Sequence, residues 1–147
     1  MLSWEKKLLD IDPNQNEWPT CFACGQENPV GLKLKFIKNG DEAWSEFTID
    51  KNYEGWYGVV HGGIVSTILD EAMAYTYFPQ TKGVTAKAEI RFHQPAPVSV
   101  PMIATGKLEK RTRKLLTTSA RLTLKDGTLI AESTAQAYVV SSSDQET

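Results

Sequence analysis

The stretch from Val59 to Tyr75, VVHGGIVSTILDEAMAY, combines residue types that can do chemistry with a segment that could hold them. His61 is followed at once by two glycines, and Asp70 lies nine residues after the histidine. Glycines before a helix let a ligand approach the backbone, and the first N–H groups of a helix have no partner within it. Such groups can stabilise an oxyanion. The segment therefore indicates backbone N–H groups at a helix start that could polarise a carbonyl, with an acid further along, although Gly-Gly also suits an ordinary tight turn.

The helix expected to carry these groups runs from about Gly62 to Phe78, where Pro79 stops it. Its apolar stripe consists of Ile64, Val65, Ile68, Leu69, Ala72 and Met73. Another side holds only small residues and one acid, namely Gly63, Thr67, Asp70 and Ala74. A solvent-facing helix would normally carry Lys, Arg and Glu there. We therefore expect the helix to be covered nearly all round, by its own sheet and by a partner subunit, with Asp70 at least half buried.

The acids have more than one interpretation. A buried carboxylate is costly unless it is hydrogen-bonded or paired, so Asp70 could be a structural cap or ion-pair partner. It could equally be a functional acid with a shifted proton affinity. Glu71 lies about 100° further round the helix and is expected to face solvent or an arginine such as Arg91. His61 by itself is more often a structural imidazole than a catalytic one.

The rest of the chain predicts strands around this helix. Leu32–Phe36 alternate apolar residues with lysines, and an Asn-Gly turn at residues 39–40 leads to a partner strand at 42–49. After the helix, four strands begin near residues 84, 100, 116 and 129, and their hairpin-length connections make the sheet mostly antiparallel. One helix and one sheet form an α+β fold. Residues 1–30 are expected to form a short helix and a loop, and residues 141–147 a flexible tail.

Length and composition narrow the functional classes. The 147 residues fit one domain, with 41% hydrophobic and 23% charged residues and a net charge of −2. No bulk basic field exists to gather nucleic acid or anionic lipid. No apolar run approaches the ~20 residues of a membrane span, and MLSWEKKLLDID lacks the apolar core of a secretory signal. A cytoplasmic protein without nucleic-acid or membrane partners is therefore expected.

Cys21 and Cys24 are the only cysteines and form one CxxC motif in CFACG. One such pair supplies at most two of the four ligands of a zinc ion, and neither histidine has finger-like spacing to it. A redox CxxC follows a strand and opens a helix, whereas a turn-rich segment follows here. A structural loop is the favoured interpretation and no metal is expected. A metal shared between subunits and a redox pair remain as alternatives.

At the level of motifs the chain resembles the hotdog-fold acyl-CoA thioesterases, in the PaaI-like branch of the 4-hydroxybenzoyl-CoA thioesterase superfamily. VVHGGIVSTILDEAMAY is similar to the central-helix motif of that family. CFACGQENPVGLKLKF is similar to the lead-in of one subgroup, and GVTAKAEIRFHQPAPV to the strand after the helix. The resemblance implies a hotdog fold, in which an antiparallel sheet of about five or six strands wraps one long central helix. It also implies a homodimer whose sheets join edge to edge, and possible pairing of dimers into a tetramer.

The resemblance further implies hydrolysis of an acyl-CoA thioester at sites on the dimer interface. The family's acid, a general base or a nucleophile, falls on Asp70. The backbone N–H that holds the thioester oxygen falls on Gly62, and His61 is matched as an orienting residue. A hydroxyl residue from the other subunit helps hold the water and falls on Thr85. No cofactor is expected beyond the coenzyme A of the substrate.

Other assignments are less well supported by the resemblance. Glu71 is the weaker alternative for the acid, and the Asn or Gln that some relatives carry before the histidine has no clear counterpart. Candidate substrate-binding residues are Gly63, Trp56, Tyr57, Arg111 and Arg113. The two arginines belong to the densest basic run, which suits the phosphates of coenzyme A but also suits a solvated turn. The aromatic residues suit an acyl chain but also suit packing.

Two other functions stay open on the same fold. One is enoyl-CoA hydration, although hydratases place their histidine and acid differently around the thioester. The other is a non-catalytic module that binds acyl-CoA without releasing free thiol. The sequence does not specify the acyl group.

Overall fold

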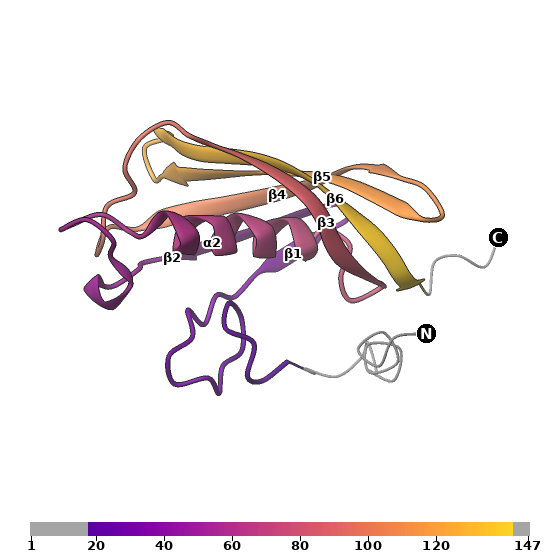
Figure 1. The fold of residues 1–147 in the computed structure, drawn as a ribbon, viewed down its shortest axis with the longest axis horizontal. Helices are drawn as coiled ribbons and strands as arrows, with labels where there is room; N and C mark the ends of the chain where they lie inside the picture. The colour runs from indigo at the N-terminus through magenta and orange to yellow at the C-terminus, as the bar shows by residue number, and fades with distance from the viewer. Residues whose placement is uncertain (1–17, 143–147) are drawn as a thin grey trace.

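A computed structural model describes residues 18–142, which form one sheet wrapped around one helix (Figure 1). The sheet consists of β1 (Ile37–Asn39), β2 (Glu42–Phe47), β3 (Thr81–Phe92), β4 (Met102–Arg111), β5 (Leu115–Leu124) and β6 (Leu129–Ser142). Its spatial order is β1-β2-β4-β5-β6-β3, and every neighbouring pair is antiparallel. The helix is α2 (Gly62–Ala74), which follows a short 3-10 helix, η1 (Lys51–Tyr53). The expected hotdog arrangement is confirmed.

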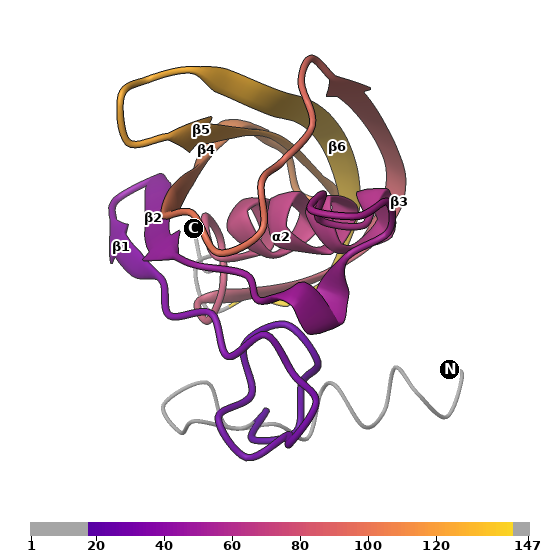
Figure 2. The same cartoon turned by 90° about the vertical axis from the view of Figure 1, so that its left-hand side faces the viewer.

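Helix α2 lies in the hollow of the curved sheet (Figure 2). The buried members of its apolar stripe are Val65, Ile68, Leu69, Ala72 and Met73. They join fully buried residues of the sheet, among them Met102, Leu122 and Ala131, in one core. Burying each large apolar side chain contributes roughly 1.5–3 kcal/mol to folding. This packing fixes which sides of α2 remain available for chemistry.

Gly106 lets β4 approach α2 closely. A Cβ atom at this position would lie 2.2 Å from the carbonyl oxygen of Ala72. We expect Gly106→Ala to lower the free energy of unfolding by about 1–3 kcal/mol, because the helix and strand must move apart. Gly62→Ala is the matched control, since the nearest atom to its Cβ would be 3.8 Å away. Urea unfolding of both variants measures the difference, and equal stability would show that the close contact does not constrain the fold.

The helix ends earlier than its apolar pattern predicts. It stops at Ala74 rather than Phe78, and residues 75–80 form turns. The Thr76 hydroxyl donates to the Met73 carbonyl at 2.6 Å, and the Tyr77 N–H bonds Ala74 in the tighter i→i+3 pattern. These local bonds replace the helical ladder before the proline is reached.

The strand expected at Leu32–Phe36 is wrong, because that segment does not join the sheet. Its burial does alternate as predicted, with Leu34 buried and Lys33 and Lys35 exposed. Its N–H groups donate instead to the preceding loop: the N–H of Leu32 bonds the carbonyl of Phe22, and the N–H of Leu34 bonds the carbonyl of Ala23. The alternation of apolar residues and lysines therefore correctly indicated a half-buried extended segment, but the first strand begins only at residue 37.

The remaining boundaries follow the sequence prediction closely. The turn at Asn39-Gly40 joins β1 to β2, with Gly40 at a φ of 60°. Strand β6 continues through Ser142, so the expected tail at 141–147 starts too early. The expected N-terminal helix at residues 1–12 and the end of the tail lie outside the described residues. Within residues 18–142, no helix combines the length and apolar character needed to cross a bilayer.

Candidate active site

The start of α2 presents one available backbone donor. The His61 imidazole caps the helix, and its Nδ1 accepts the N–H of Gly63 at 2.9 Å. The His61 carbonyl accepts the N–H groups of Ile64 and Val65. Among the described residues, the N–H of Gly62 has no hydrogen-bond partner. The geometry thus separates two roles: His61 organises the helix start, and Gly62 rather than Gly63 has an N–H free to meet a ligand.

A pocket of about 830 Å³ opens in front of this donor. Its lining is mainly apolar and includes Val59, Val65, Phe92 and Pro95, with His93 and Gln94 at one side. The Phe92 ring is the group nearest to the position that a Gly62 side chain would occupy. A carbonyl bound at the Gly62 N–H would therefore lie beside apolar surface that includes the Phe92 ring.

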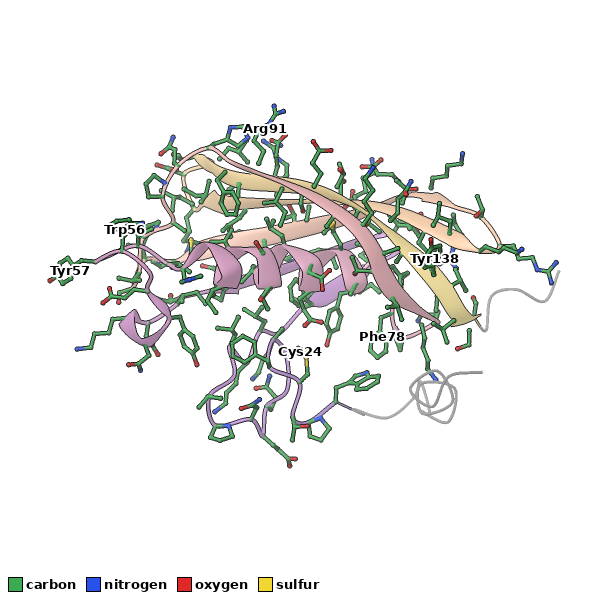
Figure 3. All side chains as sticks on the ribbon, viewed as in Figure 1. Cys24, Trp56, Tyr57, Phe78, Arg91 and Tyr138 are labelled. Atoms are coloured by element: carbon green, nitrogen blue, oxygen red, sulfur yellow. The ribbon has the colours of Figure 1, made fainter. Side chains whose placement is uncertain are left out.

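Trp56 and Tyr57 project from the loop before α2, beyond the end of the molecule (Figure 3). Trp56 lines the pocket and is 85% exposed, and Tyr57 is 97% exposed. Neither ring packs on the core, so packing within this chain does not explain them. Large exposed aromatic side chains are typical of ligand or partner surfaces.

Asp70 and Thr85 meet on the open side of the helix. The Thr85 hydroxyl donates to Asp70 Oδ1 at 2.8 Å, and both residues are exposed. Within its own chain Asp70 is therefore exposed, and its hydroxyl partner is the Thr85 of that chain. The expected burial of Asp70 against a partner subunit, and the expected hydroxyl from that subunit, stay predictions. Strand β3 is the edge of the sheet, which leaves residues 85–89 exposed beside the acid.

The structure does not bring Asp70 together with Gly62. The two residues are eight positions apart on one straight helix, which separates them by about 12 Å along its axis. Asp70 does not line the pocket in front of Gly62. Within a single chain, the acid and the polarising N–H therefore cannot act on the same carbonyl group, since reacting atoms must approach to about 3–3.5 Å.

Glu71 faces inward rather than toward solvent or Arg91, so that expectation is wrong. It lies against the loop of residues 18–36, where Cys21 Sγ is 3.6 Å from its Oε2. Arg91 lies on the far side of the sheet from this loop (Figure 3). Burial raises the pKa of Glu71 to about 7, and the neighbouring charge of Asp70 adds to the increase. Sequence spacing missed this contact because the two segments are 50 residues apart.

The CxxC motif forms a tight turn under α2. The Gly25 N–H donates to the Cys21 carbonyl at 2.8 Å, and burial raises the pKa of the Cys24 thiol to about 12. A second pocket, of about 190 Å³, adjoins both sulfur atoms, Glu71 and Lys82. No helix follows the motif, so the backbone lacks the helix start that activates a redox CxxC.

The basic run lies away from the pocket. Arg111 ends β4 and donates from Nη1 to the Thr81 hydroxyl at 2.7 Å. The β4–β5 turn that carries Arg113 is at the end of the molecule opposite to the start of α2 (Figure 1). In one chain these arginines are therefore remote from the Gly62 donor.

Comparison with known proteins identifies the family. A family model described as the thioesterase superfamily matches residues 57–131. The chain belongs to this superfamily. The match covers most of the pocket lining, α2 and strands β3, β4 and β5, while the PaaI-like branch stays a prediction.

One protein is similar to this chain in sequence, and two solved structures are similar to it in fold. A Candida albicans protein described as "Uncharacterized protein, mitochondrial" is 41% identical over 63 residues, which cover 40% of this chain and only 28% of that protein. A Streptococcus mutans protein bound to acetyl CoA has a TM-score of 0.70 and 14% identity, covering 74% of this chain and 90% of its own. A hypothetical thioesterase with coenzyme A from Streptococcus pneumoniae has a TM-score of 0.69 and 16% identity, covering 74% and 88%. At 14% and 16% identity, these two structural similarities show the fold alone.

Proposed function

We propose that the protein hydrolyses acyl-CoA thioesters in sites that two protomers build together. One protomer contributes the Gly62 N–H with its pocket, and the other contributes Asp70 with Thr85. Membership of the thioesterase superfamily supports the reaction class, and two structures of similar fold hold coenzyme A or acetyl CoA. The observation that carries the proposal is the hydrogen-bonded Asp70–Thr85 pair on an uncovered face of α2, well away from Gly62.

A two-fold axis between two protomers would bring Asp70 of one chain close to Gly62 of the other. If two α2 helices pack antiparallel about an axis near Ser66, Gly62 of one helix faces Asp70 of the other, because Ser66 is midway between them in sequence. The facing side of α2 carries small residues that permit close approach, and β3 offers an unpaired sheet edge beside it. Symmetry then creates two equivalent sites in each homodimer.

The proposed reaction uses each group once. The Gly62 N–H holds the thioester oxygen while Asp70, oriented by the Thr85 hydroxyl, removes a proton from water. The water oxygen bonds the carbonyl carbon, the carbon–sulfur bond breaks, and the departing thiolate takes up the proton. The products are a free acid and coenzyme A. Direct attack by Asp70 through an anhydride uses the same residues and leads to the same products.

A thiol-release assay over acyl-CoA esters, from short aliphatic to aromatic, tests the function. We expect at least one ester to release free coenzyme A in proportion to enzyme concentration. Tight binding of the esters without thiol release would show a binding module instead. Loss of the enoyl absorbance with no thiol release would show a hydratase.

The basic run yields a separate prediction about coenzyme A docking. In the proposed dimer, Arg113 of one protomer lies toward the acid side of the shared site. We expect Arg113→Gln to raise KM several-fold with little change in kcat, since a phosphate contact far from the reacting atoms contributes uniform binding. Steady-state kinetics measure both constants, with Lys125→Gln as the control at a basic residue that pairs with Glu46. An unchanged KM would remove the basic run from the substrate site.

A further inference from the structure

The fold brings a third potential metal ligand to the CxxC motif. Cys21 Sγ, Cys24 Sγ and a carboxylate oxygen of Glu71 all lie within 4.8 Å of one another. All three residues are partly shielded from solvent. Figure 3 shows Cys24 on the loop below α2. Glu71 belongs to α2 and meets this loop at Cys21 Sγ. Sequence spacing supplied only two ligands, and the third depends on a contact between the loop and the helix.

The separation between Cys21 Sγ and Glu71 Oε2 matches the spacing of two ligands around a tetrahedral zinc ion. Zinc binds sulfur at about 2.3 Å and carboxylate oxygen at about 2.0 Å, which places sulfur and oxygen ligands about 3.5 Å apart. The separation between Cys21 Sγ and Glu71 Oε2 is 3.6 Å. Two sulfur ligands of one zinc ion lie about 3.8 Å apart. The sulfur atoms of Cys21 and Cys24 are within 4.8 Å of each other, which is compatible with this spacing. Small side-chain rotations would therefore accommodate an ion.

The loop holds the two sulfur atoms in place through its backbone. The turn closes by the hydrogen bond from Gly25 to Cys21, and the Glu27 N–H donates to the Pro19 carbonyl at 2.8 Å. A Cβ atom at Gly25 would lie 2.4 Å from the Cys21 nitrogen, so only glycine permits this turn. Such a turn presents both cysteines toward α2 before any ion arrives, which reduces the entropic cost of binding.

We propose that Cys21, Cys24 and Glu71 bind a zinc-type divalent ion that ties the loop of residues 18–36 to helix α2. Thiolates select soft ions of this class, and carboxylate oxygen is also a zinc ligand. Three protein ligands leave the fourth position to water, on the side of the adjoining pocket of about 190 Å³. This replaces the expectation of no metal, and it does not depend on the proposed thioesterase activity.

A disulfide is the competing interpretation of the same cysteines. A carboxylate has no role in a disulfide, and its negative charge beside two thiols opposes the thiolate on which exchange depends. A bound cation offsets that charge and uses the carboxylate. The position of Glu71 against the CxxC motif therefore favours the metal.

The test measures metal content and needs no substrate. Full-length protein is purified under reducing conditions and titrated with Zn²⁺ against a chromophoric chelator, and with Co²⁺ to detect the thiolate-to-cobalt charge-transfer band. We expect one ion per chain and a higher melting temperature in the presence of Zn²⁺. Cys24→Ser and Glu71→Gln should each weaken zinc binding by at least about tenfold. Glu27→Gln makes the same change at an exposed residue of the same loop and should leave binding unchanged.

Three results would overturn the proposal. These are no binding of Zn²⁺ by the reduced wild-type protein, a Cys21–Cys24 disulfide found by thiol trapping in fresh lysate, and full affinity in both ligand variants. If Cys24→Ser does not fold, as judged by circular dichroism, Glu71→Gln and the cobalt spectrum of the wild-type protein decide. Glu71→Gln changes the charge with almost no change in volume.

Discussion

Replacing Asp70 with asparagine is expected to reduce kcat for the best acyl-CoA ester by about 10²–10⁴-fold, because a general base contributes that factor. Asparagine keeps the shape of the side chain and can still accept the hydrogen bond from Thr85. Asp70 is exposed within its own chain, so the substitution should change the free energy of unfolding of the protomer by less than about 0.5 kcal/mol. The measurement is thiol release at saturating substrate, with circular dichroism to verify the fold.

Asp41→Asn is the matched control for this experiment. Asp41 is an exposed aspartate in the β1–β2 turn, on a part of the chain with no proposed role in the reaction. It should retain the wild-type rate. Wild-type turnover by Asp70→Asn would remove this residue from the mechanism, whereas equal losses in both variants would indicate a general effect of charge.

Much of the fold could be predicted because its signals are local. Alternating residues predicted the long strands after the helix, and the Asn-Gly pair predicted the hairpin turn at Gly40, which adopts a positive φ value. Local signals failed where tertiary hydrogen bonds decide the outcome. Leu32–Phe36 has the pattern of a strand but pairs with the loop around Phe22 and Ala23. Periodicity reports which side of a segment is buried and does not report its hydrogen-bond partner.

In the candidate site, too, local signals located some residues, whereas the contacts of others depend on the fold. The spacing from His61 to Asp70 located both the helix start and the acid, since all these residues lie on one element. The family resemblance selected Thr85 as a hydroxyl that holds the water from the other subunit, whereas the structure shows its hydroxyl bonded to Asp70 of the same chain. Glu71 could not be assigned because its partners are in the loop around Cys21, 50 residues earlier. A helix position fixes the direction of a side chain, and only the fold determines what lies in that direction.

Mixing two inactive variants should restore activity if the site is shared between protomers. Gly62→Ala keeps the N–H but adds a methyl group beside Phe92, where the thioester would lie, and a displacement of about 1 Å can cost roughly 10²-fold in rate. Asp70→Asn removes the acid from the other half of the site. In a mixed dimer, one site receives both defects, and the other combines an intact Gly62 with an intact Asp70.

Random reassortment makes half of the dimers mixed, and each has one intact site, so the mixture should recover about a quarter of the wild-type rate. The variants are mixed, dissociated in mild denaturant, returned to buffer and assayed for thiol release. Each variant taken alone through the same cycle is the control and should stay inactive. Exchange is verified by native mass spectrometry of differently tagged chains.

If mixed dimers form and the rate stays at the level of the single variants, each protomer contains its own complete site. The 12 Å separation between Gly62 and Asp70 would then need a movement of the helix to close it. Recovery would show instead that the chain depends on a second copy of itself to place the acid opposite the polarised carbonyl.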